Sequence, residues 1–216
     1  MNLHLDVFEG MNPFQENTYL VHNNQTAHLI DPGFSSASEW NRLQNVLEQK
    51  KLQIEAIVLT HGHVDHVIGL QEAFDRFQVP VCMHHETWPF LEHFPQQAMM
   101  FGFQADPIKV DPQYVEPSAD LRIGSFTYDA RYTPGHAPGH LAFYCKEAGW
   151  VISGDALFAG SIGRTDLYGG DFQLLEKSIR TQLYTLPDET VVWPGHGPKT
   201  TVGRERRSNP FVSGGI

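Results

Sequence analysis

Four side chains that commonly bind metal ions occur in residues 60–66, which read Thr-His-Gly-His-Val-Asp-His. His61 and His63 are two residues apart, which places both on one side of an extended chain. Asp65 and His66 are adjacent, so they point in different directions and can reach two separate positions. Imidazole nitrogens and carboxylate oxygens are common ligands of zinc and related divalent metals. This stretch therefore predicts a metal site.

The residues on either side of this stretch predict how it is held. Residues 54–59 have the apolar character of a buried strand, and residues 67–78 carry apolar side chains at helical spacing. The donors are therefore expected in a turn at the carboxyl end of a strand, where open α/β sheets place their sites.

Strands and helices alternate along the rest of the chain. A helix capped by Ser38 is expected to run to about Lys50, and a second, capped by Asp171, to cover 172–184 with Leu174 facing inward. Two rounds of strands followed by a helix predict an α/β fold with two sheets packed face to face and helices outside. Strands are expected at 3–8, at 18–31 with a turn at Asn23-Asn24, and at 79–83, 121–123, 126–132, 141–145, 150–153 and 191–193.

Residues 84–106 are rich in aromatic and methionine side chains. Two interpretations are open: these side chains bury one or two helices against the core, or they form the wall of a substrate pocket or a subunit contact. His84, His85 and His93 show no ligand pattern and are expected to be ordinary loop or surface residues.

The composition is that of an acidic globular protein. With 216 residues, the chain suits a single domain over residues 1–216 with a full core. The formal net charge of −10 excludes a general nucleic-acid binder, which needs a basic face. Cys82 and Cys145 lie in apolar runs, so buried free thiols in a reducing cytosol are expected. Without a signal peptide or an apolar run near the ~20 residues of a membrane span, we expect a soluble cytoplasmic protein and no membrane partner.

Three further places offer a donor directly after a predicted strand: His136, Asp155 and His196. Each stands near a glycine, which leaves room for the backbone to approach an ion. Together with residues 61–66, they provide enough donors for two metal ions.

This order of donors, His-x-His-x-Asp-His followed by separate His, Asp and His, resembles the ligand set of the metallo-β-lactamase superfamily. The resemblance covers nearly the whole chain and implies a four-layer αββα sandwich of two mixed β-sheets flanked by helices. The best-known β-lactamase subclass has Cys in place of Asp155, and flavo-di-iron proteins have Glu in place of His63, which disfavours both functions. The resemblance implies two metal positions and a shared bridging carboxylate: His61, His63 and His136; Asp65, His66 and His196; and Asp155 between them.

Within the superfamily, residues 134–140, 158–166 and 203–211 resemble the glyoxalase II group, and more narrowly its short bacterial glyoxalase II-like hydrolases. Full glyoxalase II carries a C-terminal helical domain that holds glutathione, and this chain ends at Ile216 without one. The resemblance implies a hydrolase of a small thioester, such as a hydroxyacyl-glutathione.

Such a hydrolase uses a metal-bound hydroxide to attack the carbonyl carbon. A thioester suits it, because the thiolate leaves with little help from a general acid. Asp65 and Asp155 are the expected catalytic carboxylates, Asp65 by orienting the hydroxide and Asp155 by bridging the metals. His140 either forms hydrogen bonds around the site or has a purely structural role. Two zinc ions are expected first, and iron or manganese would accept the same donors.

Basic residues near the C-terminal end are candidates for binding an anionic part of the substrate, and a solvated basic surface is the alternative. Arg164 lies in a glycine-rich loop, where it either contacts substrate or pairs with Asp166. The C-terminal cluster consists of Lys199, Arg204, Arg206 and Arg207, with Arg204 and Arg207 the candidate substrate ligands.

A persulfide dioxygenase is the main alternative function. It shares this fold and would hold a single iron with His61, His136 and Asp155. Its members tend to carry Cys where this chain has His140 and lack the Gly-His-Gly-Pro form of 195–198, so the hydrolase is favoured. A non-enzymatic metal-binding protein is a third interpretation, disfavoured because structural sites are rarely dinuclear. A small-molecule substrate is expected, and the sequence leaves the oligomeric state open.

Overall fold

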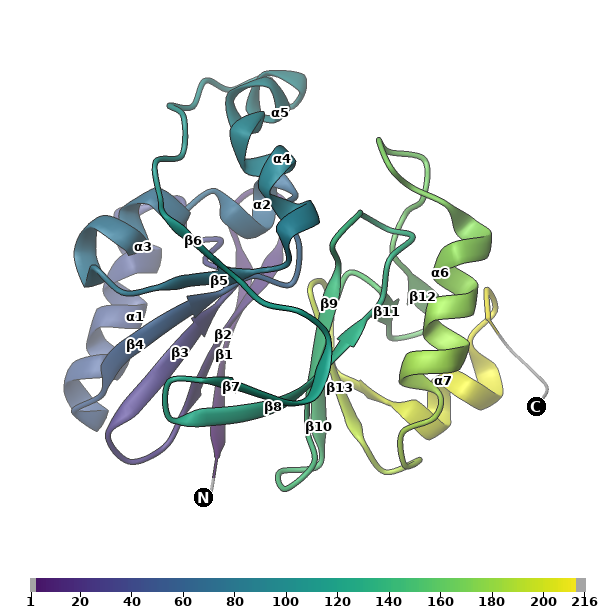
Figure 1. Cartoon of the computed structure of the whole chain (residues 1–216). Coiled ribbons are helices and arrows are strands. Elements are labelled where there is room, and N and C mark those ends of the chain that lie inside the picture. Colours follow the sequence, from purple (N-terminus) through teal and green to yellow (C-terminus); the bar gives the residue numbers. More distant parts are fainter. Residues whose placement is uncertain (1–2, 213–216) are drawn as a thin grey trace.

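Residues 3–212 are described by a computed structural model, in which two β-sheets pack face to face (Figure 1). Helices cover the outer faces of both sheets, which gives four layers. The predicted αββα sandwich is confirmed. Within residues 3–212, no helix has both the length and the apolar character required to cross a membrane.

The first sheet is built from the N-terminal half of the chain, in the order β1-β2-β3-β4-β5-β6. The first three strands are antiparallel and β3 to β6 are parallel, so the sheet is mixed. Asn23 forms the predicted turn between β2 and β3, because its side-chain oxygen accepts hydrogen bonds from the backbone N–H groups of Gln25 and Thr26. The strands are β1 (His4–Met11), β2 (Glu16–His22), β3 (Thr26–Ile30), β4 (Gln53–Val58), β5 (Val81–Met83) and β6 (Pro112–Tyr114).

The second sheet has the order β14-β13-β10-β9-β8-β7. It is also mixed, because β10 and β13 are parallel and the other neighbours are antiparallel. Its strands are β7 (Ser118–Ile123), β8 (Phe126–Tyr132), β9 (Leu141–Cys145), β10 (Trp150–Gly154), β13 (Val191–Pro194) and β14 (Thr200–Thr201). A separate short hairpin consists of β11 (Leu157–Phe158) and β12 (Ser161–Ile162).

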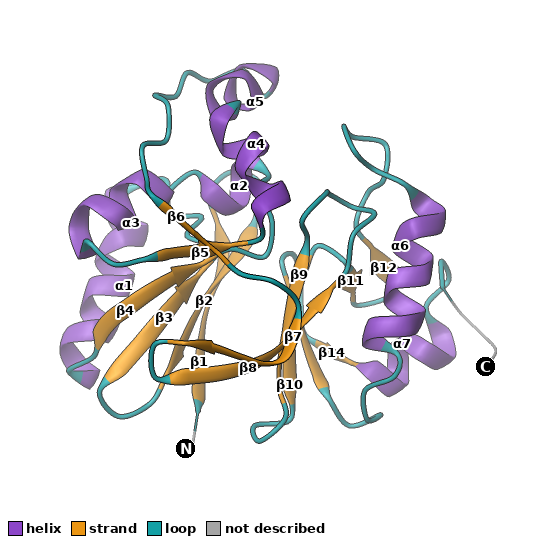
Figure 2. Ribbon diagram, in the orientation of Figure 1, coloured by secondary structure: helices purple, strands orange, loops and turns teal. Residues whose placement is uncertain are grey.

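The helices fall into three groups, which Figure 2 shows in purple. Against the first sheet lie α1 (Ala37–Lys50), α2 (Val64–Val67) and α3 (Leu70–Phe77). At one end of this sheet stand η1 (His85–Thr87), α4 (Trp88–Glu92) and α5 (Phe94–Met100). Against the second sheet lie α6 (Phe172–Ser178), the π-helical turn η2 (Ile179–Leu183) and α7 (Val202–Ser208).

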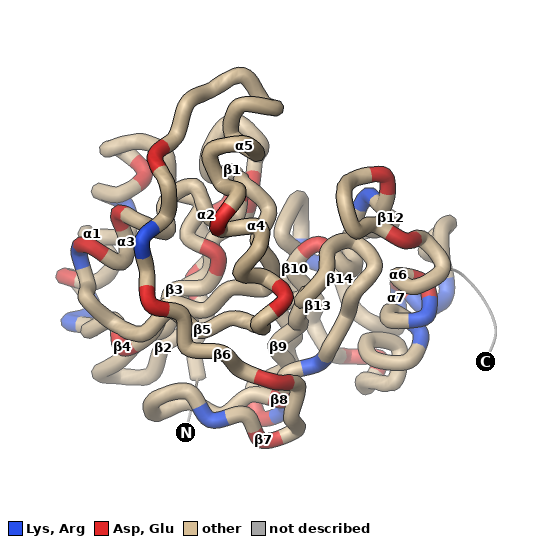
Figure 3. Tube along the Cα trace, turned by 45° about the horizontal axis from the view of Figure 1, so that its top comes forward, with Lys and Arg blue, Asp and Glu red and all other residues tan. Residues whose placement is uncertain are grey.

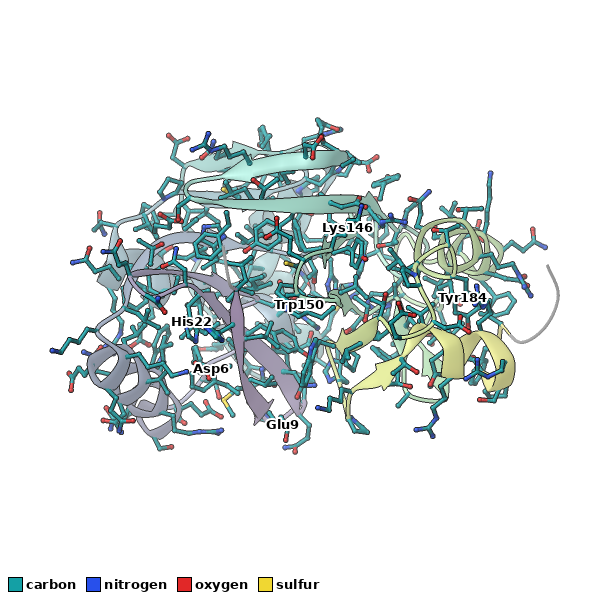
Figure 4. All side chains as sticks on the ribbon, turned by 90° about the horizontal axis from the view of Figure 1, so that it is seen from below. Asp6, Glu9, His22, Lys146, Trp150 and Tyr184 are labelled. Atoms are coloured by element: carbon teal, nitrogen blue, oxygen red, sulfur yellow. The ribbon has the colours of Figure 1, made fainter. Side chains whose placement is uncertain are left out.

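Three apolar clusters fill the spaces between the four layers. Leu43 belongs to the cluster between the first sheet and its helices. Tyr19 and Trp150 belong to the cluster between the two sheets, and Leu175 and Tyr184 to the cluster beneath α6 and α7. Figure 4, seen from below, shows Trp150 near the middle of the molecule and Tyr184 on the side of α6 and α7. The site is thus mounted on two rigid sheets that share one buried interface.

Helix α1 begins two residues earlier than predicted. Its N-cap is Ser36, not Ser38, because the Ser36 hydroxyl accepts a hydrogen bond from the backbone N–H of Glu39. In return, the Glu39 carboxylate accepts one from the backbone N–H of Ser36 at 2.8 Å. This reciprocal pair is a capping box, which a cap at Ser38 could not form with Glu39.

The helix predicted over 67–78 covers only Leu70–Phe77 as α3, because Val67 ends the preceding helix α2 and Gly69 separates the two. The backbone N–H of Gly69 donates to the carbonyl of Pro32 at 2.9 Å, and a side chain there would come within 2.7 Å of the Phe34 carbonyl oxygen. A close approach between two backbones therefore breaks the helix.

The prediction that Leu174 faces inward was wrong, since 39% of its surface is exposed. The buried face of α6 is formed by Leu175 and Ser178 instead, with the predicted Asp171 as the N-cap.

Candidate metal centre

The seven predicted donors meet at one end of the sandwich. The first half of the chain supplies those that follow β4 or lie in α2, and the second half supplies one after each of β8, β10 and β13. In chain order they are His61, His63, Asp65, His66, His136, Asp155 and His196.

One group of donors consists of His61, His63 and His136, whose candidate ligand atoms all lie within 4.8 Å of one another. All three side chains are buried. Nδ1 of His63 lies 2.8 Å from Nε2 of His136, so ring nitrogens of both residues face the same point.

A second group consists of Asp65, His66 and His196, again within 4.8 Å of one another. Nε2 of His196 lies 3.0 Å from a carboxylate oxygen of Asp65. Asp155 stands between the two groups, 3.3 Å from Nε2 of His66 and 3.5 Å from Nε2 of His136. The structure thus brings all seven side chains together, with three on each side of Asp155.

The electrostatics differ between the two groups. Burial lowers the pKa of His61 well below its usual range and that of His63 to about 3, so both imidazoles are neutral, as metal ligands must be. Burial is the largest single influence on His66 and Asp155 and disfavours their charged forms, but the surrounding opposite charges together outweigh it: Asp155, Asp65 and Asp31 around His66, and His66, His136 and His196 around Asp155. The pKa of His66 is therefore raised well above its usual range, and that of Asp155 is lowered well below.

Three donor atoms in the centre are buried without a hydrogen-bond partner among residues 3–212: Nε2 of His61, Nε2 of His66 and Oδ1 of Asp155. An unsatisfied buried polar atom costs about 1–3 kcal/mol. Coordination to a cation satisfies all three, so the residues present fit metal binding.

Asp31, the last residue of the strand predicted over 18–31, supports the centre from behind. One carboxylate oxygen accepts a hydrogen bond from the Thr60 backbone N–H at 2.7 Å. The other lies 2.6 Å from the Thr60 hydroxyl and 3.0 Å from Nδ1 of His66. Nδ1 of His61 lies 3.0 Å from the same hydroxyl. Asp31 directly follows β3, and the other donors were identified by the same position after a strand. This pattern could therefore have identified Asp31 from the sequence.

Two further residues fix the ligand turns. His140 accepts a hydrogen bond from the Asp155 backbone N–H at Nε2, 3.1 Å away, so it holds the backbone that carries the bridging carboxylate. Asn17 on β2 donates to the carbonyls of Pro194 and Gly197, which flank His196. No donor pattern marks Asn17 in the sequence, because its role depends on a contact between opposite ends of the chain.

Gly195 shows why a glycine stands beside the last ligand. A Cβ at this position would collide with Oδ1 of Asp155 and lie 2.6 Å from a ring carbon of His66. The backbone of the His196 turn therefore packs directly against the donors.

A cavity of about 750 Å³ opens onto these donors. Phe90, Met100 and Phe101 line it, so the aromatic segment does form a pocket wall. Leu91 and Phe94 in the same segment are buried, which shows that it also packs a helical pair onto the core.

The three arginines proposed to contact substrate have different positions. Arg164 lines the cavity and pairs with Asp166 at 2.8 Å. Arg204 and Arg207 lie on α7, and neither belongs to the described residues that line the cavity. Arg207 instead pairs with Asp188 at 3.1 Å.

A family model of the metallo-beta-lactamase superfamily matches residues 11–196. The chain belongs to this superfamily. The hydroxyacylglutathione hydrolase GloC of Haemophilus influenzae is 38% identical over 203 residues, which cover 93% of this chain and 94% of that protein.

Two solved structures are similar over nearly the whole chain. The BLEG-1 B3 metallo-beta-lactamase is 36% identical and gives a TM-score of 0.86. The match covers 98% of this chain and 100% of the BLEG-1 chain. TTHA1623, solved in a di-iron-bound form, is 38% identical and gives a TM-score of 0.84. The match covers 95% of this chain and 100% of the TTHA1623 chain. Family membership and the donor set together identify a metal-dependent hydrolase of this superfamily.

Proposed function

We propose that the protein hydrolyses a small thioester, such as a hydroxyacyl-glutathione, with two divalent metal ions. The observation that carries this proposal is the position of Asp155 between two groups of donors. The hydrolase named GloC among the relatives supports the thioester, and the di-iron form of TTHA1623 supports a pair of ions. We propose zinc first, with iron or manganese as alternatives for the same donors.

In this proposal each residue has a separate task. Divalent ions at such a centre lower the pKa of water and polarise a carbonyl group. Asp65, partly exposed to the cavity, would orient the attacking water, and Asp155 would supply a carboxylate between the two metal positions. The departing thiolate needs little help from a general acid. The two metal positions are held by His61, His63 and His136, and by Asp65, His66 and His196.

We further propose that the protein works in the cytoplasm. Cys82 and Cys145 are both buried free thiols, and burial raises the pKa of Cys82 to about 11. Such thiols are the usual state in a reducing compartment.

The test uses strictly anaerobic, metal-loaded protein with S-lactoylglutathione. A hydrolase needs no oxygen, so we expect the zinc- or manganese-loaded protein to turn over this substrate at the same rate with and without oxygen. Asp65→Ala should abolish most activity, and His66→Ala should lower bound metal from near two ions per chain toward one. A β-lactam such as nitrocefin serves as the comparison substrate and should be hydrolysed poorly.

A persulfide dioxygenase would give the opposite results in the anaerobic test and with Asp65→Ala. It needs oxygen and iron, and Asp65 lies outside its set of His61, His136 and Asp155. Oxygen consumption with glutathione persulfide, lost anaerobically and restored only by iron, would overturn the proposal. A single bound ion under metal-replete conditions would contradict the dinuclear centre.

A further inference from the structure

The cavity over the metal centre has a wall of large apolar side chains. Met100 and Phe101, at the end of α5, line it although 77% and 45% of their surfaces are exposed. Large apolar side chains left exposed beside a site mark a surface that binds something apolar.

Aromatic contacts hold two parts of this wall in place. The rings of Phe14 and Phe101 meet edge to face, with centroids 5.1 Å apart. The ring of Phe90, in the same wall, lies 6.1 Å from the largely exposed ring of Tyr168, measured between centroids. Pairs at these separations stabilise a defined geometry, so the apolar wall exists before a substrate binds.

Positive charge is scarce in the same cavity. Among the described residues that line it, Arg164 is the sole lysine or arginine. Its guanidinium makes two hydrogen bonds of 2.8 Å to Asp166, which hold the pKa of that carboxyl at about 2, so the pair carries no net charge. Figure 3 shows α5 and the turn after it in tan, the colour of residues without Asp, Glu, Lys or Arg.

The basic cluster at the C-terminal end does not supply the missing charge. Arg206 and Arg207 both pair with Asp188, and their helix, α7, packs on the outer face of the second sheet. Glutathione carries two carboxylates and one ammonium group, and the sole arginine among the described residues that line the cavity is already paired with Asp166, so the net negative charge would lack a cationic partner there.

We propose that the cavity selects thioesters with an aromatic or branched aliphatic group beside the thioester, in preference to those of glutathione. This inference rests on the proposed thioester hydrolysis and narrows its substrate class. The apolar group packs against Phe90, Met100 and Phe101, while the carbonyl lies over the metal donors. Removing apolar surface from water provides the binding free energy.

A matched pair of substrates tests this selection. S-lactoylglutathione and the S-lactoyl thioester of benzyl mercaptan share the acyl group, and both release an alkyl thiolate. We expect kcat/KM of the zinc-loaded protein to be about tenfold higher for the benzyl thioester, the factor that corresponds to ~1.4 kcal/mol.

Substitutions of two neighbouring methionines distinguish an effect of the cavity wall from a general effect of losing exposed apolar surface. Met100→Ala and Phe101→Ala should raise KM for the benzyl thioester severalfold and leave the glutathione thioester nearly unchanged. Met99→Ala is the matched control, because Met99 is on the same helix and 71% exposed but is not part of the cavity lining. It should leave both substrates unchanged.

Calorimetric titration with the two product thiols gives a readout that does not depend on turnover. Benzyl mercaptan should bind the zinc-loaded protein more tightly than glutathione, and Met100→Ala should remove that difference while Met99→Ala keeps it. Equal or tighter binding of glutathione, or variants that weaken both thiols alike, would overturn the proposed selection. Hydrolysis of neither thioester would refute the proposed function itself, which is a different result.

Discussion

Asp31 holds two parts of the metal centre together through its contacts with Thr60 and His66. It is buried and has a φ of 50°, in the left-handed region that Asp and Asn tolerate. With Nδ1 of His66 facing this carboxylate, Nε2 remains available to a metal. Asp31 therefore orients His66 as a metal ligand.

Asp31→Asn should weaken metal binding while keeping the backbone conformation. An amide cannot accept hydrogen bonds at both positions, so one contact to Thr60 or His66 is lost. Loss of such a supporting carboxylate costs about 10–100-fold in metal affinity. Competition with a chromogenic chelator measures this change. Asp75→Asn, on the exposed surface of α3, is the control and should match the wild type.

His28 makes stability depend on pH. It is buried between the sheets, with Nδ1 2.9 Å from the Tyr128 hydroxyl and Nε2 3.2 Å from Glu55. Burial outweighs the attraction of Glu55 and lowers the pKa of His28 from 6.5 to about 4. Below pH 6.5 the unfolded chain binds a proton that the folded protein does not, so stability falls as the pH drops toward 4.

We expect His28 to remove about 2 kcal/mol of unfolding free energy between pH 7 and pH 5. Urea denaturation of chelator-treated wild type and His28→Gln at both pH values measures it. The variant should be less stable at pH 7 but lose about 2 kcal/mol less on acidification. Equal losses in the two proteins would contradict this role for His28.

Helices, strands and strand-end donors could be predicted where a short local sequence pattern determines them. They were less predictable where a contact between distant residues sets their position. The strand-end donors could be identified because each stands in a short stretch with its own pattern. The break at Gly69 could not, because it depends on the Pro32 carbonyl of another turn. The position of Met100 on the cavity wall likewise depends on how α5 stands over the first sheet.

The capping box stabilises the first turn of α1. Ser36→Ala removes the hydroxyl that accepts from Glu39 and should cost about 1 kcal/mol of unfolding free energy. Ser38→Ala removes only a contact with the Ser36 hydroxyl and should cost less than half as much. Chemical denaturation of the two variants side by side measures the difference. A larger effect at Ser38 would mean that the helix begins where the sequence suggested.

The whole molecule divides its metal donors between two halves. His61, His63, Asp65 and His66 come with the first sheet, and His136, Asp155 and His196 with the second. Between them lies the shared interface that contains Tyr19 and Trp150. The donors can converge only when both halves are folded and correctly packed.

Metal ions consequently act as reversible cross-links that favour the folded state by mass action. A ligand at 100 times its dissociation constant stabilises the folded state by about 2.7 kcal/mol per site. For a protein of this size, chelation should lower the midpoint of thermal unfolding by roughly 5–10 °C for each site vacated. Differential scanning calorimetry with zinc and with EDTA measures this shift, and an unchanged midpoint would contradict it. Cellular metal supply would then set how long the chain survives proteolysis as well as how fast it turns over substrate.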